Sequence, residues 1–111
     1  MSQEIRPLEA LADQLEQVSA GYAARFGLHR DGDWFMLKLQ EELGELTSSY
    51  VALTGRARPR ERDDAADRQA FEEELADVLA HVLLLARHAG IDADRAVDDK
   101  WLRWLGDSAD V

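Results

Sequence analysis

Two short acidic motifs contain the residues of this chain that are best suited to chemistry. Glu42 and Glu45 lie three residues apart in the first motif, and Glu74 and Asp77 repeat that spacing in the second. On a helix, residues three apart are neighbours on one face, about 5–6 Å apart at Cβ. If the two helices pack antiparallel, the four carboxylates converge on one spot. Because unpaired carboxylates repel one another, this arrangement predicts a site for a hard divalent cation such as Mg²⁺ or Mn²⁺.

The simplest alternative is that these acids form a solvated helix face, since a single match to Glu-x-x-Glu carries little information. Three features favour a site instead. The acids border an apolar seam, the pairing recurs on a second helix, and the small residues Gly44 and Ala76 separate the acids. A glycine inside a helix costs about 1 kcal/mol relative to alanine, so Gly44 indicates close approach of another group. A di-iron site would need Glu-x-x-His pairs, and no Glu of this chain is followed three residues later by His.

The elements that must position these acids are predicted to be four helices, at about 7–26, 33–54, 67–88 and 92–106, because apolar residues recur every three or four positions. The acids of the second and third helices run beside an apolar seam. The seams consist of Met36, Leu39, Leu43, Leu46, Tyr50 and Leu53 in one helix and Phe71, Leu75, Val78, Val82 and Leu85 in the other. Short connections between amphipathic helices predict an all-α four-helix bundle. The seams are wide for so short a chain, so we expect homo-oligomerisation to complete the bundle.

Length and composition restrict the class of protein. A chain of 111 residues predicts one domain over 1–111, with frayed ends at about 1–6 and 107–111. Cysteine is absent, the first residues lack the apolar core of a secretory signal, and no apolar run is long enough to span a membrane. We therefore expect a cytoplasmic protein with no membrane partner. The net charge of −10 argues against a nucleic-acid polymer as partner.

Together, the two motifs and the helix that follows them resemble a known family. The chain is similar to the MazG-like all-α nucleoside triphosphate pyrophosphohydrolases, whose signature is Glu-Glu-x-x-Glu, a gap, Glu-x-x-Asp, and a final helix that carries a lysine. Here the signature reads 41–45, then 28 intervening residues, then 74–77, and Gly90-Ile91-Asp92 leads into the helix of Lys100. The resemblance covers about 35–103. The 28-residue gap is long for the family and contains Arg56, Arg58, Arg60 and Arg62, which suit either a solvated loop or a lid over a nucleotide.

The resemblance implies that Glu42, Glu45, Glu74 and Asp77 bind Mg²⁺, with Mn²⁺ as a substitute. It also implies cleavage of a nucleoside triphosphate between the α and β phosphates, which gives the monophosphate and pyrophosphate. A triphosphate is highly anionic, so an acidic pocket can bind it only through bridging cations. Those cations would polarise phosphoryl oxygens and lower the pKa of an attacking water.

Further roles follow from the resemblance and from residue type. Lys100 matches the lysine of the family and is expected to contact phosphate, with Arg103 one turn on as a second candidate and Lys38 as a weaker one. Spacing alone leaves Lys100 equally open to being a surface lysine. Glu41 is a candidate for accepting a proton from metal-bound water, or for a place beside the metal ligands. Trp34 is our preferred candidate for stacking on a base.

His81 extends the stripe of Glu74 and Asp77 by one turn, and we expect a histidine at the edge of the core, bonded to a neighbour, in preference to a metal ligand. The predicted function is that of a Mg²⁺-dependent nucleoside triphosphate pyrophosphohydrolase which removes unwanted nucleotides and forms a homodimer or homotetramer. The alternatives are an enzyme like phosphoribosyl-ATP pyrophosphohydrolase, a non-catalytic helical oligomerisation or regulatory module, and a metal-buffering bundle.

Overall fold

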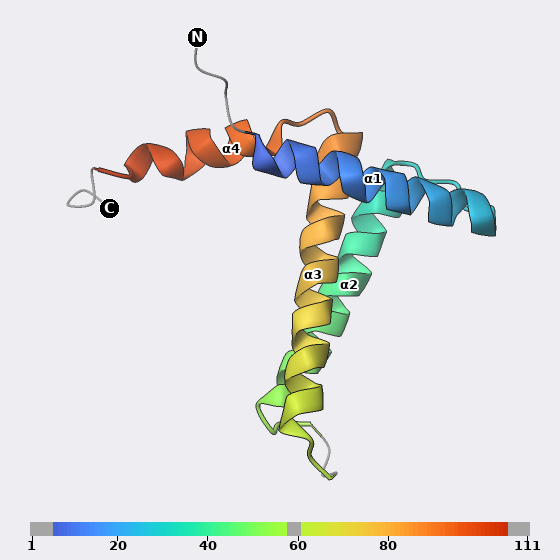
Figure 1. The fold of residues 1–111 in the computed structure, drawn as a ribbon, viewed down its shortest axis with the longest axis vertical. Coiled ribbons are helices and arrows are strands. Elements are labelled where there is room, and N and C mark those ends of the chain that lie inside the picture. The colour runs from blue at the N-terminus through green and yellow to red at the C-terminus, as the bar shows by residue number, and fades with distance from the viewer. Residues whose placement is uncertain (1–5, 58–60, 107–111) are drawn as a thin grey trace.

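The structure, a computed structural model, describes residues 6–57 and 61–106. They form four α-helices and one short 3-10 helix, and no strand occurs within these ranges. The elements are α1 (Pro7–Phe26), α2 (Gly32–Leu53), α3 (Asp64–His88), α4 (Ala93–Lys100) and the 3-10 helix η1 (Leu102–Trp104). The predicted all-α fold of four helices is therefore confirmed (Figure 1). The predicted frayed ends, apart from Arg6 at the first of them, lie outside the described residues, as do Arg58 and Arg60.

Aspartates that directly precede the helices determine where three of them begin. Asp31, Asp63 and Asp92 each accept a hydrogen bond from the backbone N–H three residues on, at 2.8, 3.1 and 3.1 Å, at the start of α2, α3 and α4 respectively. Such N-caps satisfy donors that a helix leaves free at its first turn. The sequence prediction placed the cap of α2 at Asp33 and the start of α3 at Asp67, because several acidic residues there are equally suitable caps.

The last helix is shorter than predicted. The backbone N–H of Trp101 still bonds to the carbonyl of Val97, but the next bonds join residues only three apart, from Trp104 to Trp101 and from Leu105 to Leu102. The chain therefore tightens into η1 after Lys100 instead of continuing as an α-helix to Gly106. Apolar spacing alone does not distinguish these two conformations.

Helices α2 and α3 form an antiparallel hairpin, which is the structural basis of the predicted site. Ring pairs confirm the register: Phe35 near the start of α2 stacks on His88 at the end of α3, and Tyr50 near the end of α2 contacts Phe71 near the start of α3, with centroids 4.5 and 5.9 Å apart. Every second member of each predicted seam is partly buried in the structure. These residues are Leu39, Leu46, Leu53, Phe71, Val78 and Leu85.

The other half of each seam is exposed. The exposed seam residues, which we call the outer seam, are Met36, Leu43, Tyr50, Leu75 and Val82, with exposed fractions between 43% and 50%. In each helix they recur at intervals of seven residues, as core positions do in packed helix pairs. The hairpin thus presents two apolar stripes, of which the single chain covers one.

Helix α1 crosses the end of the hairpin where α2 begins and α3 ends (Figure 1). Arg30, in the connection between α1 and α2, holds this crossing through a two-pronged ion pair in which Nη1 and Nη2 each lie 2.8 Å from an oxygen of Glu16. Its Nη1 also donates to the Ser19 hydroxyl at 3.0 Å, and its guanidinium lies over the Phe35 ring. The hydrogen bond from Arg30 lowers the pKa of Glu16 despite partial burial. One side chain therefore connects α1, the linker and α2.

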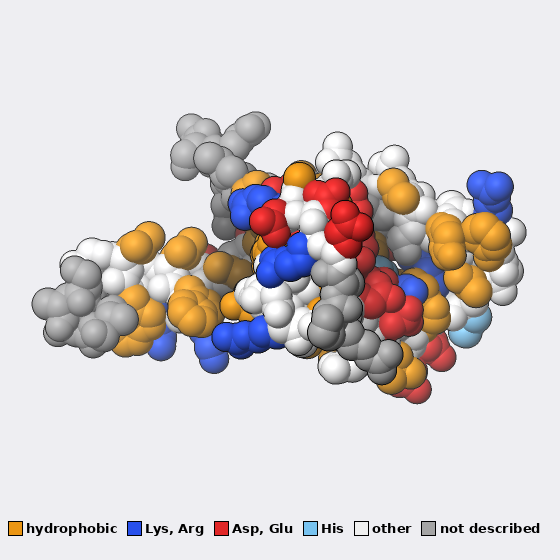
Figure 2. Space-filling view, turned by 90° about the horizontal axis from the view of Figure 1, so that it is seen from below, with side chains coloured by type: hydrophobic (Ala, Val, Ile, Leu, Met, Phe, Trp, Pro, Cys, Tyr) orange, Lys and Arg blue, Asp and Glu red, His pale blue; other side chains and the backbone are white. Residues whose placement is uncertain are grey.

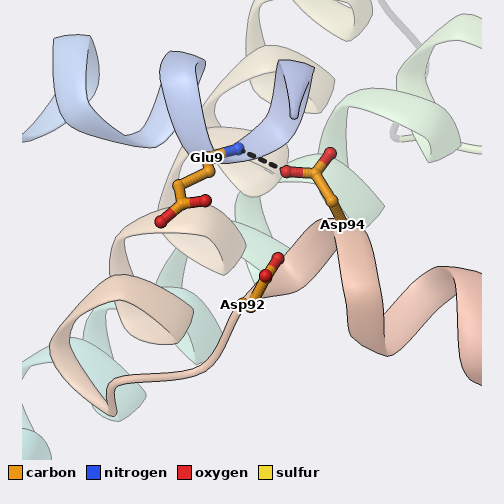
Figure 3. A group of neighbouring side chains, drawn as sticks. All are labelled: Glu9, Asp92 and Asp94. Atoms are coloured by element: carbon orange, nitrogen blue, oxygen red, sulfur yellow. Dashed lines mark hydrogen bonds between the residues drawn. The ribbon is translucent and has the colours of Figure 1, made fainter. Parts of the chain in front are cut away.

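A carboxylate on α4 caps α1. Arg6, at the N-cap of α1, gives no side-chain cap, but Asp94 accepts the backbone N–H groups of Leu8 and Glu9, each at 2.9 Å (Figure 3). Asp92 pairs with Arg6 beside it. The positive end of the α1 dipole favours such an anion. Glu9, Asp92 and Asp94 lie close enough together for their oxygens to surround an ion, but Asp92 and Asp94 already have partners, so this group serves the joint between two helices.

Beyond this joint, α4 and η1 form an arm that extends away from the hairpin (Figure 1). Hydrophobic side chains lie along the arm, at the left of Figure 2, and Trp101 and Leu105 are 69% and 77% exposed. The radius of gyration is 17.6 Å, whereas a compact domain of this length has a radius of about 13 Å. The single chain is thus extended, with much apolar surface left uncovered.

Among the described residues, no helix is both long enough and apolar enough to cross a membrane.

Candidate functional site

Three of the four predicted metal ligands meet across the hairpin. Glu42 and Glu45 on α2 and Glu74 on α3 each offer an oxygen, and these oxygens all lie within 4.8 Å of one another. We call these three residues the acid cluster. The antiparallel pairing of α2 and α3 produces this convergence, as the i, i+3 spacing predicted. Glu42 is only 8% exposed, and it is the one charged residue in the described ranges that is buried.

The acid cluster contains negative charge without matching partners. Glu42 Oε2 and Glu74 Oε2 are shielded from solvent, and neither accepts a hydrogen bond from any described residue. Loss of solvation raises the pKa of Glu42, and the charges of Glu45 and Asp77 raise it further. The same three causes, in the same order, raise the pKa of Glu74. Buried carboxylate oxygens without partners are costly, and a cation among them would remove that cost.

Asp77, Lys38 and Glu41 surround the acid cluster. Asp77 lies outside the closest group, but its charge acts on both Glu42 and Glu74. Lys38 Nζ lies 3.4 Å from Glu41 Oε1 and 3.8 Å from Glu42 Oε1. The Lys38 ammonium lies near Oε1 of Glu42. It therefore leaves Oε2 of Glu42 and Oε2 of Glu74 without a partner.

A cavity of about 380 Å³ opens beside the cluster, between α1, α2 and α3. We call it the aromatic cavity. Its lining residues are Leu15, Val18, Ser19, Tyr22, Trp34, Lys38, Asp77, Ala80, His81 and Leu84. None of the three residues of the acid cluster lines this cavity, but Asp77 and Lys38 belong to its wall and also act on the acids. Trp34, the predicted stacking residue, stands in the wall with its ring edge-on to His81 at a centroid distance of 6.3 Å.

A second hollow lies on the other side of the acids. It measures about 320 Å³, and its wall consists of Glu45, Ser48, Ser49, Ala52, Ala70 and Glu74. Small side chains thus leave room in this second hollow, whereas rings and aliphatic side chains line the aromatic cavity.

Two predicted phosphate-binding residues are far from this site within the chain. Lys100 ends α4 and Arg103 lies in η1, on the arm that extends away from the hairpin (Figure 1). The guanidinium of Arg103 lies over the ring of Trp104, 4.7 Å from its centroid. One copy of the chain therefore does not bring Lys100 or Arg103 to the acid cluster.

One expectation about another residue was wrong, and one contribution was missed. The close approach predicted at Gly44 is not made by the described residues, since a Cβ built there meets no atom within 4 Å, and it stays a prediction for a ligand or a second copy. His81 was expected to bond to a neighbour, but its Nδ1 is shielded and has no hydrogen-bond partner among the described residues. Ser19 of α1 lines the cavity, and no spacing signal indicates this, because it depends on where Arg30 places α1.

Comparison with known proteins agrees with this geometry. The family model of the MazG nucleotide pyrophosphohydrolase domain matches residues 32–101, which span all of α2, α3 and α4 and both acidic motifs. No curated protein and no solved structure matches the chain. The matched segment comprises well over half of the sequence and contains the acid cluster, with Trp34, Lys38, Asp77 and His81 beside it. The chain belongs to the MazG nucleotide pyrophosphohydrolase domain family.

Proposed function

We propose that the protein is a Mg²⁺-dependent nucleoside triphosphate pyrophosphohydrolase that cleaves between the α and β phosphates and releases the monophosphate and pyrophosphate. The observation that carries the proposal is the pair of shielded oxygens, Glu42 Oε2 and Glu74 Oε2, which have no partner within a group of three carboxylates. A donor set made only of carboxylate oxygens suits a hard cation, and Mn²⁺ is the natural substitute for Mg²⁺.

In this proposal Glu42, Glu45 and Glu74 hold the cation, and Asp77 is the fourth ligand at the boundary with the aromatic cavity. The bound ion would neutralise phosphate charge and lower the pKa of a water molecule. Glu41 is exposed and hydrogen-bonded to Lys38, which suits a residue that accepts a proton beside the ligands or positions Lys38. Lys38 Nζ, between Glu41 and Glu42, would meet the triphosphate as it approaches the acids.

The nucleoside would occupy the aromatic cavity, with its base against Trp34 and its phosphates toward Asp77 and the acid cluster. The cavity volume of about 380 Å³ leaves space for a base and a sugar. Stacking on an aromatic ring contributes about 1–3 kcal/mol per base and tolerates any base, because every base has a π-face. The protein would thus bind the two ends of a nucleotide by different means. A role in removing unwanted nucleotides follows if modified bases enter this cavity.

We further propose that the protein acts as a homodimer or homotetramer. The outer seam, with its seven-residue intervals on both helices of the hairpin, has the pattern of a surface that another helix pair covers. The arm adds exposed Trp101 and Leu105. In one copy this arm extends away from the acids, so the predicted contact of Lys100 or Arg103 with phosphate requires a second copy of the chain.

Product analysis tests the proposed reaction. The protein is incubated with standard and modified nucleoside triphosphates and with phosphoribosyl-ATP, each with Mg²⁺ or Mn²⁺. We expect monophosphate and pyrophosphate, and no turnover once the metal is chelated. Diphosphate with orthophosphate would contradict the proposed bond, and turnover of phosphoribosyl-ATP alone would identify the rival enzyme. Metal binding without turnover would support a metal-buffering bundle, whereas neither binding nor turnover would support a non-catalytic module.

Two substitutions test the metal ligands. Glu45→Gln and Asp77→Asn should each abolish turnover and leave the helical circular dichroism unchanged, because both side chains are exposed. Glu72→Gln is the matched control, since Glu72 is an exposed glutamate of α3 that pairs only with Arg68 among the described residues. Full activity in both ligand variants would refute this assignment.

A further inference from the structure

Among the polar residues that line the aromatic cavity, His81 is the one with a shielded side-chain atom that has no hydrogen-bond partner among the described residues. Ser19 accepts a hydrogen bond from Arg30, and Lys38 pairs with Glu41 and Glu42. Tyr22 is 57% exposed, so water can satisfy its hydroxyl. His81 lies in the cavity wall with Trp34 against it, and its shielded Nδ1 has no hydrogen-bond partner among the described residues. No hydrogen bond through Nδ1 therefore holds the ring, and Nε2 is the atom through which it can meet a ligand in the cavity.

The two ring nitrogens of His81 have different surroundings. Nδ1 is shielded from solvent, whereas Nε2 is not among the shielded atoms that lack a partner. A neutral imidazole carries one N–H, and a shielded N–H without an acceptor is rare and costly. The proton therefore belongs on Nε2, the nitrogen that remains accessible. Burial and the nearby charge of Lys38 lower the pKa of His81, although Asp77 and Glu41 act in the opposite direction, and the net lowering favours the neutral ring.

The position of His81 along α3 relates it to the base rather than to the phosphates. It lies one helical turn beyond Asp77 and seven residues beyond Glu74, which correspond to about 6 Å and about 10 Å along the axis. Phosphates bound at the acid cluster would leave the sugar near Asp77 and the far edge of the base near His81. This placement follows from the position of Asp77 and Lys38, which line the cavity and also act on the acids.

We propose that His81 determines which base the protein accepts, by donating a hydrogen bond from Nε2–H to a carbonyl oxygen on the far edge of the base. This inference rests on the proposed function, in which a nucleotide occupies the aromatic cavity. The favoured substrates carry a carbonyl at position 4 of a pyrimidine or position 6 of a purine. A base with an amino group at that position places a hydrogen-bond donor against the N–H of His81 and is rejected. A site that bonds one polar group of its substrate discriminates strongly against an analogue that lacks this group.

Matched nucleotide pairs measure this discrimination. The ratio of kcat/KM for dUTP over dCTP, and for ITP over ATP, should be about tenfold or more in the wild-type protein. His81→Phe keeps a ring of similar size without a donor, and should bring both ratios close to one. His81→Gln retains an amide donor and should restore part of the preference. His29→Phe is the control, because His29 lies in the exposed linker between α1 and α2, outside the cavity, and should keep the wild-type ratios.

Two measurements separate this inference from the proposed reaction. Quenching of tryptophan fluorescence by UMP and CMP, without metal, reports base preference when there is no turnover. Imidazole nitrogen NMR of the wild-type protein shows which ring nitrogen carries the proton, so the test does not depend on a variant that folds. Turnover with unchanged ratios in His81→Phe, equal binding of UMP and CMP, or a proton on Nδ1 would each overturn the role of His81. A binding preference without any turnover would instead refute the proposed reaction and leave the base-reading role standing.

Discussion

Glu42 illustrates how strongly the fold alters a single carboxylate. It is nearly buried, its Oε2 has no partner, and two other acids raise its pKa in addition to burial. Lys38 is the only cation close to it among the described residues, at 3.8 Å. The side chain is therefore unfavourable for the metal-free protein and valuable to a protein that binds a divalent ion. Residues that carry function are often destabilising in this way.

Glu42→Gln should stabilise the metal-free protein at pH 7. Removing this buried charge, whose Oε2 has no partner, recovers about 1–3 kcal/mol, since the amide is neutral and similar in shape. The same change should abolish the rise in Tm that Mg²⁺ causes in the wild-type protein. Thermal unfolding with and without Mg²⁺ measures both effects, and Glu72→Gln should show neither. A wild-type response to Mg²⁺ in the Glu42→Gln variant would argue against metal binding at this position.

The stabilising effect of Mg²⁺ should depend on pH. Glu42 and Glu74 have raised pKa values in the folded protein, so their favourable contribution is complete below the unfolded value of 4.5 and is lost as pH rises through the folded pKa values. Above those values the acids are charged and repel, and a cation relieves the repulsion. Melting curves between about pH 5 and pH 8 should therefore show a Mg²⁺-induced shift that grows with pH. A shift independent of pH would mean that the ion binds elsewhere.

Residue types and spacing were sufficient to predict that Glu42, Glu45 and Glu74 meet, because the i, i+3 rule and an antiparallel hairpin leave few alternatives. They did not show that Asp77, the fourth predicted member, would lie outside the closest group. The lack of a hydrogen-bond partner for His81 Nδ1 was not predictable, since it depends on every element that packs around the ring. The burial of Glu42 was not predictable for the same reason, because burial depends on the packed structure and not on the motif.

At the scale of elements, the ion pair between Arg30 and Glu16 determines where α1 lies. Arg30→Met should lower the free energy of unfolding by about 1–3 kcal/mol, the usual contribution of hydrogen bonds to charged groups. Urea unfolding measures the loss. Arg68→Met is the control, because the Arg68–Glu72 pair is exposed at 71% and 65% and should contribute less than about 1 kcal/mol. Equal losses in the two variants would show that the crossing of α1 does not depend on Arg30.

The same ion pair has a defined pH dependence. The pKa of Glu16 is lowered in the folded protein, mainly by its hydrogen bond with Arg30, so the pair stabilises the protein above the unfolded pKa. That contribution is lost as pH falls through the folded pKa. The stability difference between the wild-type protein and Arg30→Met should therefore shrink at acidic pH, and unfolding curves at two pH values check this.

Helix positions were largely predictable because apolar periodicity was strong in α1, α2 and α3. Helix ends were less so, since Asp31 and Asp33 are both good caps and only packing selects between them. The cap that Asp94 of α4 places on α1 was not predicted. Asp94 caps a helix that lies far from it in sequence, and no local pattern in either segment indicates the contact.

At the scale of the whole molecule, the outer seam leads to a prediction about assembly. Small-angle scattering and mass measurement in solution should give a particle of two or four chains, since the single chain is extended and exposes apolar stripes. Leu43→Glu places a charge in the outer seam and should yield monomers. Leu37→Glu is the control, because Leu37 is 69% exposed and stands off that seam. A monomeric wild-type protein at micromolar concentration would contradict the assembly.

The amphipathic seams were correctly identified from the sequence, but their division into a covered and an uncovered half was not. Apolar residues recur every seven positions whether the stripe they form packs within the chain or against another copy, so the spacing does not distinguish the two cases. The position of Lys100 was not predictable for a related reason. Lys100 was expected to contact phosphate because it matches the lysine of the family, yet the arm takes it away from the hairpin within one copy.

Because Asp94 of α4 caps α1, the two helices cannot move independently at this joint. Helix α1 supplies one wall of the aromatic cavity, and its first turn is fastened to the base of the arm at Asp92 and Asp94. A displacement of α1 as the cavity fills would be transmitted through Asp92 and Asp94 to the arm that carries Trp101. Ligand entry and the docking of a neighbouring subunit would then be coupled through these two carboxylates.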